Sequence, residues 1–253
     1  RGIELSYAPD GSVYLLDWSD IGECHDNDGI HRTSGRIYRI SYGKTEPSKV
    51  DLTKWSNEDL AESVGSPNEW YSRQARQLIQ QRAAAGQDLT KAALKLMNTY
   101  RLTSSTPTAL RAMWTLNAIG SADEDWLLEQ SNDEREHIRT WSIKLLCDQE
   151  ALSEKTQKRF IEMGAQDKAG LVQLQLASAL QQLPLEDRWP LANALVSQDT
   201  FAKDPVFPLL VWYGINPAVT ENRNAALKLV AQCKIPKVRQ FIARRLAGEA
   251  GKE

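Results

Sequence analysis

The sequence has little cysteine, no excess of positive charge and no long apolar run, and each shortage excludes a class of protein. Its 253 residues include only three cysteines, Cys24, Cys147 and Cys233, which lie far apart. An odd number at such spacing argues against a disulfide framework and against a four-cysteine metal site. No Cys-x-x-Cys-His sequence is present, so covalent attachment of a c-type haem is excluded. The three cysteines are predicted to be free thiols.

Charge and hydropathy exclude two kinds of partner. The formal net charge is -2 and the 31 lysines and arginines are scattered, so no basic face for nucleic acid is evident. No apolar run approaches the roughly 20 residues that cross a bilayer, so no transmembrane segment is predicted. With 42% hydrophobic and 25% charged residues, the chain is expected to fold around a substantial core.

The first forty residues predict three short strands. Residues 3–7 and 13–18 alternate between apolar and polar side chains around the turn sequence Asp10-Gly11, which indicates a hairpin. Residues 35–42 alternate in the same way. Three strands this short do not make an independent core, because a small sheet needs another layer against it. We therefore expect residues 1–43 to be the closing part of a larger β domain, and the sequence to be a piece of a longer parent protein.

The pattern changes to helical spacing after a polar linker at residues 44–54. From Trp55 onward apolar residues recur with helix punctuation between the runs. A proline lies at the start of several runs, where its missing N–H has no helical partner to lose. These prolines are Pro67, Pro107, Pro205 and Pro236.

A repeated pattern relates six of the helical runs. Each copy begins with an apolar residue, and the next position is often arginine. A small or β-branched residue follows four positions after that arginine position, and an apolar residue three positions further on. Successive copies start 28 to 40 residues apart, which suits a unit of two helices and two turns. Because one unit cannot bury its own apolar face, the units are expected to stack as a solenoid. The copies begin at Trp70, Leu110, Ile138, Val172, Val206 and Val238.

Several segments resemble one family of large bacterial proteins. Two stretches, DGSVYLLDWSD (residues 10–20) and GIHRTSGRIYRI (residues 29–40), are similar to the final propeller blade of the planctomycete and verrucomicrobial family named membrane-bound dehydrogenases. That family joins a propeller similar to those of sorbosone and quinoprotein glucose dehydrogenases to HEAT repeats, commonly followed by a c-type cytochrome domain. The segments similar to its HEAT region are SPNEW (66–70), RQAR (73–76), LQQLPLEDRWP (180–190), DPVFPLLVWYG (204–214) and IPKVRQFIARRL (235–246).

The resemblance implies a fold, a compartment and a set of partners. It implies a mainly α chain, with a HEAT-like α-α superhelix over residues 55–253 and a partial propeller blade over residues 1–43. The parent would be a periplasmic or cell-envelope dehydrogenase with a quinone or calcium as cofactor, whereas this piece would hold none. The implied partners are the missing propeller and a downstream domain, or another protein.

An acidic segment between the second and third predicted strands is the candidate for chemistry. Five carboxylates lie within twelve residues that contain no lysine or arginine, with His25 and His31 beside them. Such a cluster suits a hard cation such as calcium, which takes six to eight oxygen ligands. The spacing matches no EF-hand, and it also suits ordinary turns. A solvated loop, part of the mouth of a complete propeller, and a metal site all stay open for Asp17, Asp20, Glu23, Asp26 and Asp28.

Other conspicuous residues are expected to be structural. Cys24 and His25 are adjacent in sequence, and such neighbours usually point apart, so no nucleophile with its base is predicted there. The tryptophans at or next to repeat positions are predicted to be core between repeats, in preference to a binding platform. Arginines at one phase of the repeat are predicted to pair with acidic residues of adjacent repeats. These residues are Trp70, Trp114, Trp141 and Trp212, and Arg111, Arg139 and Arg239.

Two hypotheses for function follow. In the first, the chain is a non-catalytic interaction and spacer module that packs against the propeller and positions partner domains. In the second, it belongs to a sugar or alcohol oxidoreductase and contributes residues 17–32 to a substrate, quinone or calcium site completed elsewhere. The basic end of the sequence is interpreted as a solvated last helix or as a docking surface for the next domain. It contains Lys234, Lys237, Arg239, Arg244 and Arg245.

Overall fold

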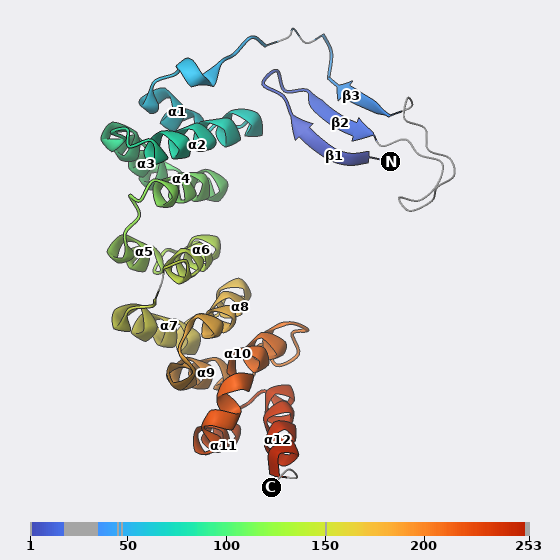
Figure 1. Ribbon diagram of the computed structural model, residues 1–253, viewed down its shortest axis with the longest axis vertical. Coiled ribbons are helices and arrows are strands. Elements are labelled where there is room, and N and C mark those ends of the chain that lie inside the picture. The colour runs from blue at the N-terminus through green and yellow to red at the C-terminus, as the bar shows by residue number, and fades with distance from the viewer. Residues whose placement is uncertain (1, 18–34, 45, 47, 150, 251–253) are drawn as a thin grey trace. The chain divides into compact units, whose positions relative to one another are not determined.

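The computed structural model is mainly helical, with a small sheet at the start of the chain (Figure 1). It describes residues 2–17, 35–44, 46, 48–149 and 151–250. The chain divides into two compact units, residues 1–121 and residues 122–253. Each unit is described by itself below.

The first unit begins with the three-stranded antiparallel sheet that the alternating residues predict. Its strands are β1 (Gly2–Tyr7), β2 (Val13–Asp17) and β3 (Arg36–Ile40), in the order β1-β2-β3. The β1–β2 turn is closed by Asp10, whose Oδ1 accepts a hydrogen bond from the backbone N–H of Ser12 at 2.9 Å. Gly11 adopts a φ of 81° in this turn, a conformation that L residues with side chains rarely take.

Twelve α-helices are present in the described residues, with three short 3-10 turns. The first unit holds the 3-10 turn η1 (Leu52–Lys54) and the helices α1 (Asn57–Ser63), α2 (Glu69–Ala84), α3 (Thr90–Leu102) and α4 (Thr106–Ala118). The second unit holds α5 (Glu124–Gln130), α6 (Glu136–Cys147), α7 (Glu154–Gln166), α8 (Gly170–Ala179), η2 (Leu180–Gln182), η3 (Leu185–Asp187), α9 (Arg188–Val196), α10 (Phe207–Glu221), α11 (Arg223–Gln232) and α12 (Pro236–Ala250).

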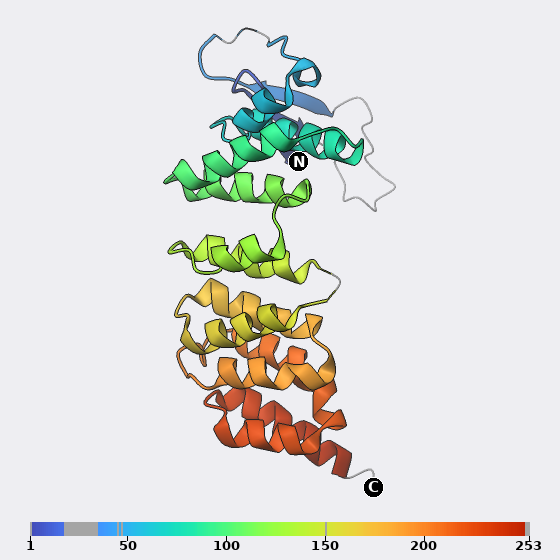
Figure 2. The same cartoon turned by 90° about the vertical axis from the view of Figure 1, so that its left-hand side faces the viewer.

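Consecutive helices form pairs, and each pair contacts its neighbour within its own unit. In the first unit α1 packs against α3, and α2 against α4. In the second unit α6 packs against α8, α8 against α10 and α10 against α12, while α7, α9 and α11 follow one another in a second row. Figure 2 shows these helices of the second unit in successive layers. Each of the six predicted repeat starts falls within five residues of the beginning of α2, α4, α6, α8, α10 or α12, so the solenoid-like fold is confirmed.

Local sequence explains where the helices begin. Ser56 and Ser153 accept hydrogen bonds from backbone N–H groups of the first turns of α1 and α7, at 3.1 and 3.2 Å. Asp123 does the same for α5 at 2.8 Å. Such N-caps satisfy donors that the helix itself cannot pair. Pro107 lies in the first turn of α4, and Pro236 begins α12, as the punctuation predicts.

Apolar side chains fill the space between the helix layers of each unit. In the first unit Leu60, Ile79 and Leu96 are fully buried, from α1, α2 and α3 respectively. In the second unit Phe160 and Leu176 are fully buried, from α7 and α8. Every described helix is too short or too polar to span a bilayer.

A proline inside α10 is the feature of the helical part that the pattern did not predict. Pro217 has no N–H to donate to the preceding turn, and its ring disturbs that turn. Close to this proline, the Arg188 guanidinium donates from Nη1 to the Gly214 carbonyl at 2.6 Å, and from Nε to the Leu183 carbonyl at 2.9 Å. Burial lowers the pKa of Arg188 from its ordinary value.

Gly214 provides a test of the packing between η2 and α10. A Cβ at this position would lie 2.7 Å from the Cβ of Leu180, which is itself fully buried. Gly214→Ala should therefore destabilise the second unit by about 1–3 kcal/mol through overpacking. The measurement is urea unfolding followed by circular dichroism. Gly248→Ala is the control, because a Cβ there meets nothing within 4 Å, and it should shift stability by at most about 1 kcal/mol. Equal unfolding midpoints for the two variants would contradict the close approach.

Candidate functional site

Of the five carboxylates in the acidic segment, the described residues include Asp17 alone. Asp17 closes β2 and lies opposite Arg36 of β3. Asp20, Glu23, Asp26 and Asp28 lie outside the described residues, as do Cys24, His25 and His31. Within the described ranges, no three His, Cys, Asp or Glu side chains come together in a way that could hold a metal ion. The calcium hypothesis for this segment stays a prediction.

Two of the three repeat arginines bridge helix pairs. Arg111 of α4 forms an ion pair with Glu69 at the start of α2 and donates to the Ser66 carbonyl at 3.2 Å. Arg139 of α6 makes a bidentate ion pair with Asp167, which precedes α8, at 2.7 and 3.0 Å. The hydrogen bonds that Arg139 donates to the Asp167 carboxylate raise the pKa of Arg139. Arg239 is exposed, with no carboxylate at ion-pairing distance in the described part of the chain.

The Arg139–Asp167 pair should contribute measurably to stability because both side chains are largely buried, with 17% and 10% exposure. A double-mutant cycle with Arg139→Gln and Asp167→Asn should give a coupling free energy of about 1–3 kcal/mol. The matched control is Lys158–Glu154, an exposed pair at 3.9 Å on α7, whose coupling should be about 0–0.5 kcal/mol. The cycles are measured by chemical unfolding. Equal coupling in both would show that the bridge contributes nothing beyond a surface pair.

The four repeat tryptophans are half-buried, which is neither a closed core nor an open platform. Each side chain rests on a neighbouring ring or cation, and these contacts fix its orientation. The ring centroids of Trp70 and Tyr71 lie 5.1 Å apart in an edge-to-face arrangement, and those of Trp212 and Phe241 lie 5.4 Å apart. The centroid of the Trp114 ring lies 5.8 Å from Arg76 Cζ, and that of Trp141 lies 4.6 Å from Lys144 Nζ.

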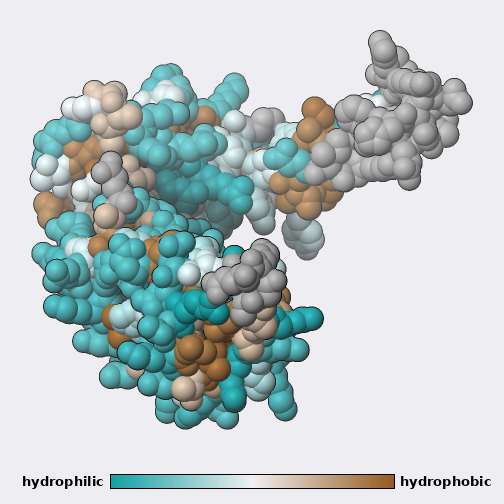
Figure 3. Space-filling view, turned by 60° about the horizontal axis from the view of Figure 1, so that its bottom comes forward, coloured by the Kyte–Doolittle hydropathy of each residue, from teal (hydrophilic) through white to brown (hydrophobic). Residues whose placement is uncertain are grey.

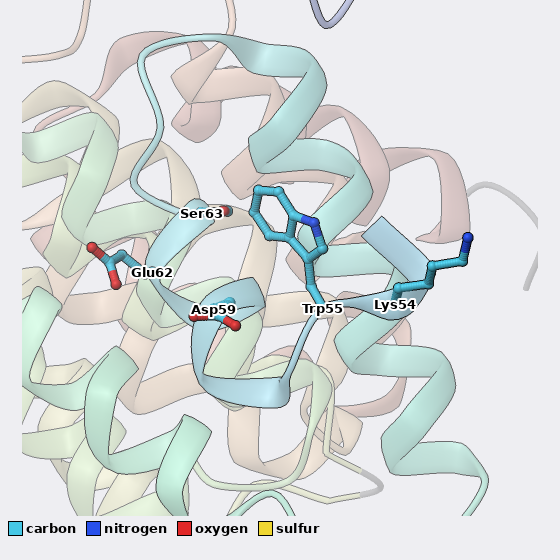
Figure 4. A pocket seen from close by; sticks show the side chains of 5 residues that line it. All are labelled: Lys54, Trp55, Asp59, Glu62 and Ser63. Carbon is cyan, nitrogen blue, oxygen red and sulfur yellow. The ribbon is translucent and has the colours of Figure 1, made fainter. Parts of the chain in front are cut away.

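A hollow of about 500 Å³ lies beside Trp55 in the first unit (Figure 4). Its lining is Lys54, Trp55, Asp59, Glu62 and Ser63, and it is open to solvent. Figure 4 shows the indole at the centre of this group, with the Lys54 side chain directed away from the carboxylates. The indole stacks on Tyr71 at 6.1 Å and 25°.

The polar groups of this hollow already have partners. Asp59 accepts a hydrogen bond from the Ser56 hydroxyl at 2.6 Å, and Glu62 pairs with Lys95 at 2.5 Å. Arg82 donates to the Trp55 carbonyl at 2.9 Å and fastens the loop to α2. No nucleophile with an adjacent base is found among these described groups. The hydrogen bonds and the ion pair hold the loop against the helices, which fits a structural role.

The described cysteines are not activated for chemistry. Cys147 at the end of α6 is half-buried, and burial, with a smaller effect from Asp148, raises its pKa from 9.0 to about 12. Cys233 is buried, and burial raises its pKa as well. Because the thiolate is the nucleophile, neither side chain is placed for nucleophilic catalysis at neutral pH.

Alkylation tests this assignment directly. At pH 8 the thiolate fraction of Cys147 should be about a thousandfold below that of an ordinary cysteine. Iodoacetamide should therefore modify Cys147 at least about a hundredfold more slowly in the folded chain than in the same chain in denaturant. Site-resolved mass spectrometry measures both rates. Similar rates in the two states would contradict a thiol held protonated by burial.

The sheet presents the most conspicuous uncovered surface of the first unit. Residues directly opposite each other on neighbouring strands share a face of the sheet. The register therefore collects two rows of apolar side chains on one face. These six residues, which we term the apolar sheet face, are Leu5, Leu15 and Tyr38 in one row and Tyr7, Val13 and Ile40 in the other.

This face is open in the described structure. Leu5 is 66% exposed, Ile40 55% and Tyr38 47%, values typical of surface residues and not of a core. Figure 3 shows brown, hydrophobic surface in the region of the sheet. The opposite face is mixed, with Glu4, Ser6 and Arg39 among its residues. An apolar face of this kind on a three-stranded sheet is typical of interaction surfaces.

Only the turn of the hairpin is fastened to the helical part by hydrogen bonds between described residues. Asn68, which caps α2, donates from Nδ2 to the carbonyls of Ala8 and Pro9 at 3.1 and 3.3 Å. Ala8 and Ser12 of the turn are buried. The outer edges of β1 and β3 pair with no described strand, so both edges can accept another strand.

Comparison with known proteins identifies no family for the chain. No protein-family model matches it, and no curated protein matches its sequence. Function is therefore inferred from the surfaces described above. The signal for the apolar sheet face was present in the alternation of residues 5–7, 13–15 and 38–40, but the sharing of one face depends on the strand register.

Proposed function

We propose that the chain is a non-catalytic helical-repeat interaction and spacer module, whose sheet docks onto further β structure and whose helix array positions partner domains. The observation that carries this proposal is the apolar sheet face, in which four of the six apolar side chains are exposed and the two central ones, Val13 and Leu15, are half-buried. Leaving such a face in water is unfavourable, at about 25 cal/mol for each Å² of apolar surface. A partner that covers it would stabilise the assembly.

The partner that suits this face is another β-sheet. Sheets pack face to face with interdigitating apolar rows, and the free edges of β1 and β3 can also extend the sheet sideways. The similarity of residues 10–20 and 29–40 to a propeller blade supports a propeller as this partner. On this proposal the helix pairs are HEAT-like repeats, and the parent is a member of the membrane-bound dehydrogenase family in the periplasm or cell envelope.

The helical part suits a spacer because its contacts are local. Each helix pair packs on its neighbour within its unit, and Arg111 and Arg139 tie adjacent pairs together. An array built this way is stabilised by nearest-neighbour interfaces and offers an extended surface for binding.

The apolar sheet face is tested with an environment-sensitive dye that binds exposed apolar surface. The double variant Leu5→Lys/Tyr38→Lys should lose more than half of the dye fluorescence of the unmodified chain, since it places two charges in one of the two rows of the face. Its helical content and melting temperature should be unchanged, because these side chains are exposed. Ser6→Lys/Ile37→Lys is the matched control: it adds two lysines to the same strands on the opposite face.

Two outcomes would contradict the proposal. Equal dye binding by both variants would show that the apolar sheet face is not the exposed surface that the partner needs. The second would come from an activity assay of the chain with sugars or alcohols, a quinone cofactor, calcium and an artificial electron acceptor. We expect no turnover there, whereas turnover would favour an oxidoreductase in which residues 17–32 contribute to the site.

A further inference from the structure

The charges of the second unit are separated along the chain. Residues 122–221 contain seventeen Asp or Glu and nine Lys or Arg, a net charge of -8. Residues 222–250, which form α11, α12 and the turn between them, contain seven Lys or Arg and a single carboxylate, Glu249, a net charge of +6. We term this last helix pair, residues 222–250, the basic end.

Five of the nine Lys and Arg side chains in residues 122–221 form ion pairs with carboxylates, whereas most of those in the basic end do not. In the earlier helices Lys155 lies between Glu124 and Asp125, at 3.1 and 2.5 Å, and Arg139 pairs with Asp167. In the basic end, five cationic side chains are exposed and have no carboxylate partner among the described residues. They are Lys228, Lys234, Lys237, Arg239 and Arg244.

Helix stability does not account for this arrangement. The N-terminus of a helix carries a partial positive charge, so cations there are unfavourable and carboxylates are favourable. Yet α12 has Lys237 in its first turn with Lys234 just before it, and neither α11 nor α12 has an acidic residue in the first turn. The positive potential of the basic end is therefore strongest around the start of α12, where an anionic ligand would be stabilised.

We propose that the basic end binds an acidic polypeptide segment, one rich in Asp and Glu. This rests on the proposed function, since it gives the helix array a partner of defined chemistry at this surface. Carboxylates of the segment would replace water around Lys234, Lys237 and Arg239 as charge-assisted hydrogen-bond acceptors. The complementary charges would also raise the rate of association at low salt.

The surrounding charges favour a short acidic segment over an extended polyanion. A duplex nucleic acid or an anionic membrane spans many tens of Å and would also approach the preceding helices, where the net charge is -8. Their repulsion acts beyond the contact, since the screening length is about 8 Å at physiological salt. A polypeptide segment contacts α11 and α12 alone, so it gains the attraction without that repulsion.

Fluorescence anisotropy of the whole chain with a labelled peptide of alternating Glu and Ser tests this inference. The peptide should bind at low salt and weaken as salt is added, while the same peptide with Gln for Glu should not bind. The triple variant Lys228→Gln/Lys234→Gln/Lys237→Gln should bind at least about tenfold more weakly. The control Lys91→Gln/Lys168→Gln/Lys203→Gln removes three equally exposed lysines elsewhere and should stay within about twofold of the unmodified chain.

Three results would overturn the inference: no binding of the acidic peptide at low salt, equal weakening in both triple variants, or tighter binding of duplex DNA or anionic vesicles than of the peptide. Leu5→Lys/Tyr38→Lys should bind the peptide like the unmodified chain, because the sheet lies in the other unit. Failure of the basic end is thereby distinguished from failure of the apolar sheet face.

Discussion

Burial of apolar side chains between successive helix pairs is the interaction on which the rest of the structure depends. No pair can cover its own apolar stripe, so the stripe of α8, for example, is covered by α6 on one side and α10 on the other. The arginine bridges and the close approach of Gly214 to Leu180 follow from this stacking, because they need two layers held at a fixed separation.

The sheet differs from the helix pairs because no described helix covers its apolar face. Its strands obey the same alternation as any half-buried sheet, and the register gathers the apolar residues on one face, but the described helices reach only its turn. The basic end is positively charged, whereas the preceding helices of its unit carry a net negative charge. The two surfaces lie in different units and have different chemistry, which is the arrangement expected of a spacer with two partners.

Sequence pattern predicts the elements well here because their signals are local. Alternation, turn residues, helix-starting prolines and the repeat phase located the three strands and the second helix of all six pairs. What it could not predict depends on contacts between elements. Arg111 turns back to Glu69 whereas Arg139 reaches forward to Asp167, and the repeat phase is the same for both. Pro217 was not expected inside a helix, because a proline in a sequence pattern usually indicates a helix start or end. The cations of the basic end were visible in the sequence, but whether they pair with carboxylates depends on contacts between elements.

Hydrogen exchange of the isolated chain, followed by mass spectrometry, tests the central claim most directly. If the sheet needs a layer that the described helices do not supply, the amides of β1, β2 and β3 should exchange far faster than those of α2, α3 and α4 in the same unit. Amides in the strands that are protected as strongly as those helices would show a sheet that is already stable by itself. That result would contradict the account of the chain as a module completed by further β structure.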